Sequence, residues 1–279
     1  MTIRAQPLNP EFDEPRAAEP SALNTLGAPF AALGRDLRGL YLLLAQTVRA
    51  MVTGKIDRTS LMAQCYSVGN GSVLFITVTM TVLGMIIVVQ SGLQTQKVIP
   101  ELSLLGANII QLLAREFAPT VCAMMLATRV GAGIAAEIGS MVVTDQVDAL
   151  RMSGAQPVEY LVVPRFIACV VMTLALSFWS LFIALVAGTF AANAVFDLNV
   201  STFINFSFVG LGDYIVMTAK AVAYGMAIPI ISSQRGLTTF GGSEGVGWAT
   251  TNAVVHSSLG IILLDLILSV FGYLVLPPV

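Results

Sequence analysis

Five long apolar stretches with very few charges constrain the fold of this chain more than any other feature. They cover, approximately, Thr59–Gln96, Leu102–Thr128, Phe166–Phe196, Phe206–Ser232 and Gly247–Leu274. An α-helix rises about 1.5 Å per residue, so each stretch is long enough to cross a hydrocarbon core of roughly 30 Å. We therefore predict an all-α integral membrane protein with five transmembrane helices.

The composition supports this fold class. Of the 279 residues, 56% are hydrophobic and only 11% are charged, whereas a soluble domain carries roughly 25% charged residues. A transmembrane β-barrel would show alternating segments of about ten residues, which this sequence lacks. The net charge of −2 gives no indication of nucleic-acid binding.

No residue pattern predicts a catalytic or metal site. The cysteines Cys65, Cys122 and Cys169 have neither metal-ligand nor disulfide spacing, so we interpret them as small buried hydrophobic residues. His256 is the only histidine and lies in an apolar stretch, where a packed or pore-facing role is expected.

The N-terminal region divides into a tail and an amphipathic helix. Residues 1–25 are polar, acidic and rich in proline, which predicts a disordered tail and no signal peptide. Within 26–58, an apolar stripe opposes a basic one, which favours a helix lying in the membrane interface; packing on protein is the alternative. The apolar stripe comprises Leu33, Leu37, Leu40, Leu44, Val48 and Met51, and the basic one Arg35, Arg38 and Arg49.

Basic residues between the stretches predict the orientation. With five spans, one side of the membrane receives Arg35, Arg38, Arg49, Lys55, Arg58, Arg151, Arg165 and Arg235, and the other receives Lys97 and little else. The positive-inside rule then places the N-terminus in the cytoplasm and the C-terminus outside.

A polar segment between the second and third stretches predicts a docking element. From about 143 to 153 the pattern is helical, with Val143, Val147 and Leu150 on one face and Asp145, Asp148 and Met152 on the other. Gly154 and Pro157 end the helix. A helix with an apolar and an acidic face suits a cytoplasmic partner, although an ordinary solvated loop helix fits the pattern as well.

Two further patterns concern packing. Ala127, Gly131, Ala135 and Gly139 repeat every four residues and form a small-residue stripe that lets another helix approach closely. Residues 240–247 are glycine-rich without the context of a nucleotide site, and we predict a flexible turn into the last span.

Two long motifs resemble the MlaE/YrbE permeases, the membrane subunits of Mla- and Mce-type ABC lipid transporters. The first consists of EIGSM (137–141), TDQVDAL (144–150), Gly154, Pro157, EYL (159–161) and Pro164-Arg165. The second consists of GGSEGVG (241–247), ATT (249–251) and AVV (253–255). The resemblance runs from about Leu33 to Tyr273 and leaves out the acidic tail.

The resemblance implies a fold and a set of partners. It implies an interfacial helix and five spans, pairing of two permeases around a lipid cavity as a homodimer or alternatively a heterodimer, and an MCE-domain protein on the periplasmic side of a bacterial inner membrane. It also implies that cytoplasmic ABC ATPase subunits bind the short helix. The ATPase-coupling candidates are Glu137, Asp145, Asp148, Ala149 and Leu150. The chain has no G-x-x-x-x-G-K-[ST] motif, so ATP and Mg are expected on the partner rather than on this chain.

Four ionisable residues inside the spans are the candidates for a lipid cavity. Each costs roughly 2.5–3.5 kcal/mol on insertion scales unless it is paired or faces water. They are Arg115, Glu116, Lys220 and Asp265, whose charges cancel, and the resemblance places them near the lipid. Buried pairs that only fix helix packing, and proton or ion coupling, remain alternatives.

The function expected from these features is the permease subunit of an ATP-driven lipid transporter. The alternatives are a proton-coupled secondary transporter, which would use Glu116 or Asp265, and a membrane scaffold of an envelope complex. Secondary transporters often contain internal repeats, and none is clear here. We expect no enzymatic activity in this chain.

Overall fold

The computed structural model describes residues 22–53, 58–98 and 105–276. By its internal contacts the chain divides into Met1–Gly39 and Leu40–Val279, and each unit is considered by itself. The described residues are almost entirely helical and contain no strand, which confirms the all-α fold. Five helices are long and apolar enough to cross a membrane.

The elements follow one another in a simple order. They are α1 (Ala22–Thr53), α2 (Arg58–Val98), α3 (Leu105–Leu112), η1 (Leu113–Phe117), α4 (Ala118–Leu126), η2 (Ala127–Gly131), α5 (Ala132–Val143), α6 (Gln146–Met152), η3 (Val158–Val162), α7 (Val163–Phe196), α8 (Val200–Phe203), α9 (Leu211–Leu237) and α10 (Gly242–Val275). The η elements are π-helical turns. The second span is therefore one continuous helix from Leu105 to Val143, with two wider turns inside it.

Several boundaries differ from the prediction: the third span begins at Val158 rather than Phe166, and the fourth runs from Leu211 to Leu237 rather than from Phe206 to Ser232. The second span continues to Val143 rather than ending near Thr128, because Arg129 and Glu137 are paired with other helices. The glycine-rich segment is mostly the first turns of α10 rather than a flexible turn. Gly241 and Gly242 supply the positive φ that starts the helix. A Cβ on Gly245 would meet the carbonyl oxygen of Phe240 at 1.8 Å, so this tight entry requires glycine.

Helix α1 belongs partly to each unit. Of the predicted tail, residues 1–21 lie outside the described residues, and α1 already begins at Ala22. The side chains of Leu33 and Arg35 also lie outside the described residues. In the second unit, the face of α1 that is buried is centred on Leu43, Thr47 and Ala50, one residue away from the predicted stripe. Small Thr47 and Ala50 allow closer packing than Val48, which stays exposed. An interfacial position of α1 remains a prediction.

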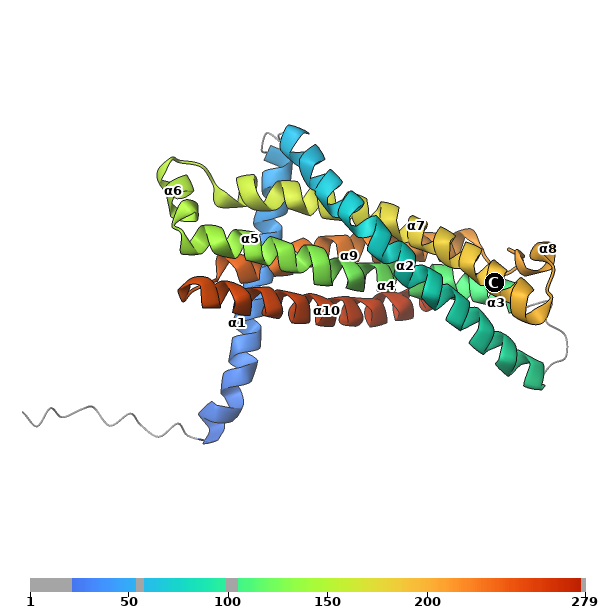
Figure 1. The fold of residues 1–279 in the computed structure, drawn as a ribbon. Helices are drawn as coiled ribbons and strands as arrows, with labels where there is room; N and C mark the ends of the chain where they lie inside the picture. Colours follow the sequence, from blue (N-terminus) through green and yellow to red (C-terminus); the bar gives the residue numbers. More distant parts are fainter. Residues whose placement is uncertain (1–21, 54–57, 99–104, 277–279) are drawn as a thin grey trace, which may run out of the picture. The chain divides into compact units, whose positions relative to one another are not determined.

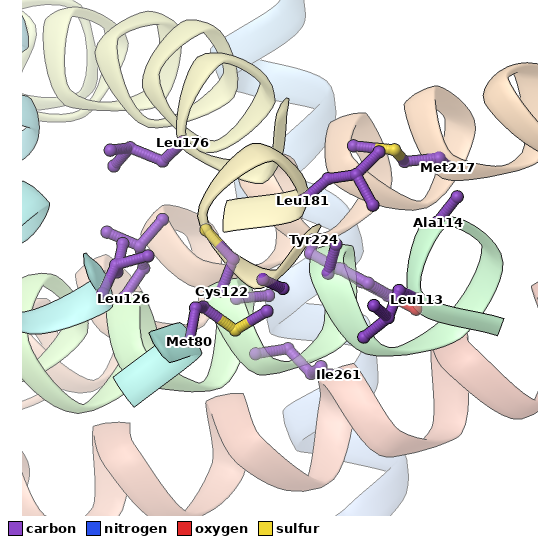
Figure 2. Packing of buried hydrophobic residues seen from close by; sticks show 14 of the residues in the cluster. Met80, Leu113, Ala114, Cys122, Leu126, Leu176, Leu181, Met217, Tyr224 and Ile261 are labelled. Carbon is purple, nitrogen blue, oxygen red and sulfur yellow. The ribbon is translucent and has the colours of Figure 1, made fainter. Parts of the chain in front are cut away.

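Within Leu40–Val279, α9 is the most enclosed span. It contacts α7, α5, α10 and α4, while α2 packs along α7 (Figure 1). A Cβ on Gly225 would meet the Cα of Val170 at 2.8 Å, so α9 and α7 touch through backbone. The hydrophobic core of the bundle holds side chains from several helices, such as Met80, Leu113, Cys122, Leu181 and Tyr224 (Figure 2).

The small-residue stripe of the second span packs as predicted. Ala127 and Ala135 are fully buried. A Cβ on Gly131 would meet Ser232 Oγ at 2.9 Å, and one on Gly139 would meet Thr239 Oγ1 at 2.9 Å. The stripe therefore faces α9 and the residues that follow it. By contrast, only 11% of the most apolar 18-residue stretch of α10 is buried, against 56% for that of α9.

Candidate functional site

Arg115 is enclosed by the start of α9 and the end of α10. It lies on the π-helical turn η1, and its Nη1 donates to Asp213 Oδ1 at 2.9 Å. Nη2 donates to the carbonyl oxygen of Leu276 at 2.7 Å, and the Tyr273 ring lies 4.4 Å from the guanidinium carbon. The side chains of Arg115 and Asp213 are 3% and 2% exposed. Asp213 also accepts from the Gly210 N–H at the start of α9, so this pair joins helix packing to a helix cap.

Glu116, the next residue, belongs to a different cluster centred on Lys220. The Lys220 ammonium is fully buried, contacts Glu116 Oε2, and lies 2.9 Å from Asp265 Oδ1. It also donates to Ser269 Oγ at 2.8 Å. Tyr224 and Thr120 donate to the same Asp265 oxygen at 2.6 and 3.0 Å. We call Glu116, Lys220, Asp265, Ser269, Tyr224 and Thr120 the Lys220 cluster.

The Lys220 cluster is open at its carboxylates. The side chains of Glu116 and Asp265 are 24% and 26% exposed, while Lys220 has no exposed surface. Glu116 Oε1 is buried and accepts no hydrogen bond within the described residues. With two carboxylates and one ammonium, the cluster carries an excess of one negative charge. A polar ligand that reaches the exposed parts of these two side chains would therefore meet net negative charge.

The four predicted cavity residues do not form one network. Glu116, Lys220 and Asp265 come together, but Arg115 pairs with Asp213 instead. The sequence did not lead us to predict Asp213 as a partner of Arg115. Its acidic side chain near the start of the same apolar stretch that contains Lys220 could have indicated such a pairing. Because the second span reaches Val143, Arg115 and Glu116 lie in its first third.

The predicted coupling helix is shorter than expected. α5 includes Val143, and α6 runs from Gln146 to Met152 after a break at Asp145, whose φ is +58°. Val147 is buried, Leu150 is half-buried and Ala149 is exposed. Asp148 points outward and pairs with Arg151 at 2.9 Å, both side chains being 64% exposed. The two-faced character predicted for this segment is thus present in a seven-residue helix of about two turns.

A surface hollow of about 360 Å³ adjoins α6. It is lined by Met141, Gln146, Ala149, Leu150, Ser153 and Tyr160. Met152, beside it, is 84% exposed. Glu137, the fifth coupling candidate, is elsewhere: it lies on α5 and pairs with Arg165 of α7 at 2.8 Å. Exposed apolar residues around a hollow are typical of a protein-binding surface.

Comparisons with known proteins agree with this architecture. The family described as Permease MlaE matches residues 61–271. A probable ABC transporter permease protein of Synechocystis is 36% identical over 82% of this chain and 88% of its own length. A probable ABC transporter permease protein of Rickettsia bellii is 31% identical over 86% of this chain and 93% of its own length.

A third relative comes from a plant. The chloroplastic protein TRIGALACTOSYLDIACYLGLYCEROL 1 of Arabidopsis thaliana is 30% identical over 85% of this chain and 68% of its own length. The family match covers all five spans entirely or nearly so, and includes both ion-pair groups and α6. The chain belongs to the MlaE permease family of multi-pass membrane proteins.

Proposed function

We propose that this chain is the membrane subunit of an ATP-driven transporter that moves phospholipid or a related lipid between the inner membrane and the outer envelope of a bacterium. The observation that carries the proposal is the Lys220 cluster. Three ionisable groups from three spans meet inside an apolar bundle, and their carboxylates stay partly accessible. Such groups are costly in a membrane and mark pathways for polar substrates.

The chemistry of the cluster favours a lipid headgroup. Its open edge presents carboxylate oxygens, which accept hydrogen bonds from an amine or from hydroxyl groups. Glu116 Oε1 has no hydrogen-bond partner among the described residues but is buried, so a headgroup would reach it only after the side chain turns outward. The bundle around it presents apolar side chains suited to acyl chains. The name of the Arabidopsis relative is that of a glycolipid, a diacylglycerol with galactose groups.

The uncovered surface of α10 supports a second copy of the chain as a partner. Large apolar side chains are exposed along this helix: Leu259, Ile262, Leu263, Leu266, Ile267 and Val270. Two α10 helices that face one another would enclose the open edges of both Lys220 clusters in a shared cavity. We propose a homodimer on this basis, with an MCE-domain protein on the periplasmic side, where the family resemblance implies it.

Energy would come from a separate polypeptide. The sequence has no phosphate-binding loop of the G-x-x-x-x-G-K-[ST] type. We propose that α6 and its adjoining hollow bind a cytoplasmic ABC ATPase, which holds ATP and Mg, and that the N-terminus is cytoplasmic. Asp145, Asp148, Ala149 and Leu150 then transmit closure of the ATPase to α5 and α7. Glu137 would act one step away, through its pair with Arg165.

Lipid transfer by the reconstituted complex tests the proposal. The permease is purified with its co-eluting ATPase, placed in vesicles, and assayed for ATP-dependent transfer of fluorescent phospholipid. We expect Glu116→Gln and Asp265→Asn to lower transfer strongly while the complex stays assembled. Asp197→Asn is the matched control, since it makes the same acid-to-amide change at an exposed loop residue after α7.

Two results would reject the proposal. One is full transfer by both cluster variants. The other is transfer that proceeds without any ATPase and follows a proton gradient, which would favour the secondary-transporter alternative.

A further inference from the structure

A polar cavity lies apart from the Lys220 cluster, between α2, α5 and α7. It has a volume of about 220 Å³. It lies toward the end of the bundle that carries α6. Its polar lining residues are Gln64, Ser67, Arg129, Glu137 and Arg165, and the remaining walls come from Val68, Val130, Gly133, Ile134 and Cys169.

Arg129 enters this cavity from the π-helical turn η2. Its Nη1 donates to Ser72 Oγ at 2.7 Å and to the Ser67 carbonyl oxygen at 3.5 Å. A Cβ on Gly71 would lie 1.8 Å from Arg129 Nη2, so glycine clears the space that the guanidinium occupies on α2. Both acceptors are neutral, and no carboxylate pairs with Arg129 among the described ion pairs.

Arg165 is the buried member of the cavity. The residue is 6% exposed. Its Nη2 pairs with Glu137 Oε1 at 2.8 Å, and its Nη1 donates to the Leu161 carbonyl oxygen at 2.5 Å. Its Nε is buried and has no acceptor within the described residues. A buried donor without an acceptor is destabilising, and an additional acceptor would remove that cost.

The charges in the cavity favour an anion. Two guanidinium groups face one carboxylate, so the lining has an excess of one positive charge, opposite to that of the Lys220 cluster. Glu137 is 56% exposed at its side chain and can swing away without being buried unpaired. Guanidinium groups bind phosphate through parallel N–H···O bonds, and one partly exposed carboxylate does not occupy all the N–H donors of two such groups.

The depth of the cavity fits a phosphate at a membrane surface. Gln64 lies six residues after the start of α2, and Glu137 six residues before the end of α5. At about 1.5 Å per residue, both are roughly 9 Å inside the helix ends. This is the level of lipid headgroups when helices of this length project from the bilayer.

We propose that this cavity is a phosphate-binding site, with Arg129 and Arg165 as its ligands. The phosphate is either that of a phospholipid headgroup in the adjoining leaflet or a free phosphate ion. The site is separate from the Lys220 cluster, so it stands whether or not that cluster contacts lipid. It would hold a lipid before entry or bind one that stays with the protein.

The test uses full-length protein in maltoside detergent, which contains no phosphate. A photoreactive benzoylphenylalanine replaces Gly133, whose Cβ would meet nothing within 4 Å. The probes are phosphatidylglycerol and a diacylglycerol with the same chains, and labelling is read by mass spectrometry. Competition with inorganic phosphate distinguishes the two sources: it displaces the lipid label if the site takes free phosphate, and leaves it unchanged if the acyl chains are needed.

Four variants make the test decisive. Arg129→Gln removes one ligand, Gly71→Ala displaces the same guanidinium while keeping its charge, and Gln64→Glu adds a negative charge to the partly exposed rim. Each is expected to lower phosphatidylglycerol labelling about tenfold, the loss of one charge-assisted contact. Arg58→Gln is the control, because it removes the same charge from an exposed site outside the cavity.

If one variant folds poorly, Gln64→Glu still tests the site, because a substitution at a partly exposed side chain is expected to leave the fold intact. Selective labelling by phosphatidylglycerol that falls in the cavity variants and not in Arg58→Gln supports the site. Equal labelling by diacylglycerol, or undiminished labelling in Gly71→Ala and Gln64→Glu, overturns it.

Discussion

Arg115 and Glu116 are consecutive residues on one π-helical turn, yet they enter opposite environments. Arg115 and its partner Asp213 are almost completely enclosed, and the guanidinium also contacts the Leu276 carbonyl and the Tyr273 ring. Glu116 shares the buried ammonium of Lys220 with Asp265, and both carboxylates remain about one quarter exposed.

The difference shows that intramembrane charge serves two purposes in this protein. Arg115 links the second span to the start of α9 through Asp213 and to the end of α10 through Leu276 and Tyr273. The pair leaves almost no exposed surface for a ligand. The Lys220 cluster holds three spans together as well, but its two acidic side chains remain about one quarter exposed. Substitutions in the two groups should therefore separate stabilisation from contact with a substrate.

The largest loss of stability is expected for Asp213→Ala. It leaves the enclosed Arg115 without its carboxylate and removes the cap at Gly210, and breaking a buried pair costs about 3–5 kcal/mol. Chemical unfolding in detergent measures this loss, with Asp197→Asn as the control. A loss below about 1 kcal/mol in the free energy of unfolding would show that the pair does not stabilise the helix packing.

A smaller loss is expected for Lys220→Met. The substitution leaves Glu116 and Asp265 without their shared cation, but both carboxylates can reach solvent at their exposed edges, so we expect about 2 kcal/mol. The same unfolding assay applies. Adding Glu116→Gln and Asp265→Asn should restore much of the stability, because no unpaired charge then remains. A loss as large as that of Asp213→Ala, without restoration, would remove the distinction between the two groups.

Charges outside the membrane are expected to affect binding rather than stability. Asp148→Lys combined with Asp145→Asn should weaken binding of the ATPase about tenfold, ~1.4 kcal/mol, with the unfolding transition unchanged. Asparagine is chosen at Asp145 because the residue has φ +58°, which asparagine tolerates. Pull-down of the ATPase measures the effect, and Glu244→Lys is the control at the same end of the bundle. Full retention of the ATPase by the double variant would refute coupling through α6.

The smallest effect is expected for Arg151→Gln. Its pair with Asp148 is exposed on both sides, and such pairs contribute about 0.5 kcal/mol or less. Unfolding should therefore be unchanged within about 0.5 kcal/mol. A larger loss would show that α6 is held in place by this pair rather than by buried Val147.

Hydropathy and charge spacing were sufficient to predict the five spans, the short polar helix and the packing stripe from Ala127 to Gly139. These features depend on local patterns that the lipid environment makes nearly obligatory. The end of the second span was wrong because a charge ends an apolar stretch in sequence, whereas Arg129 is held by Ser72 from another helix.

The partners of the intramembrane charges depended on helix packing and could not be read from neighbouring residues. Opposite charges in different spans suggested pairing in general. Only the arrangement of α9 between α5 and α10 decides that Arg115 meets Asp213 and that Glu116 meets Lys220. Glu137 was grouped with α6 because it lies in the same motif. In the structure it belongs to α5, six residues before that helix ends, and pairs with Arg165 of α7.

Photo-crosslinking with a phospholipid that carries a reactive headgroup measures whether a lipid headgroup contacts the Lys220 cluster. The purified complex is irradiated, and adducts are mapped by peptide mass spectrometry. The account predicts adducts near Leu264–Leu268 of α10, reduced several-fold in the Glu116→Gln/Asp265→Asn variant, and none around Asp213 and Tyr273. Adducts that are equally strong at both places, or that persist undiminished in the double variant, would contradict it.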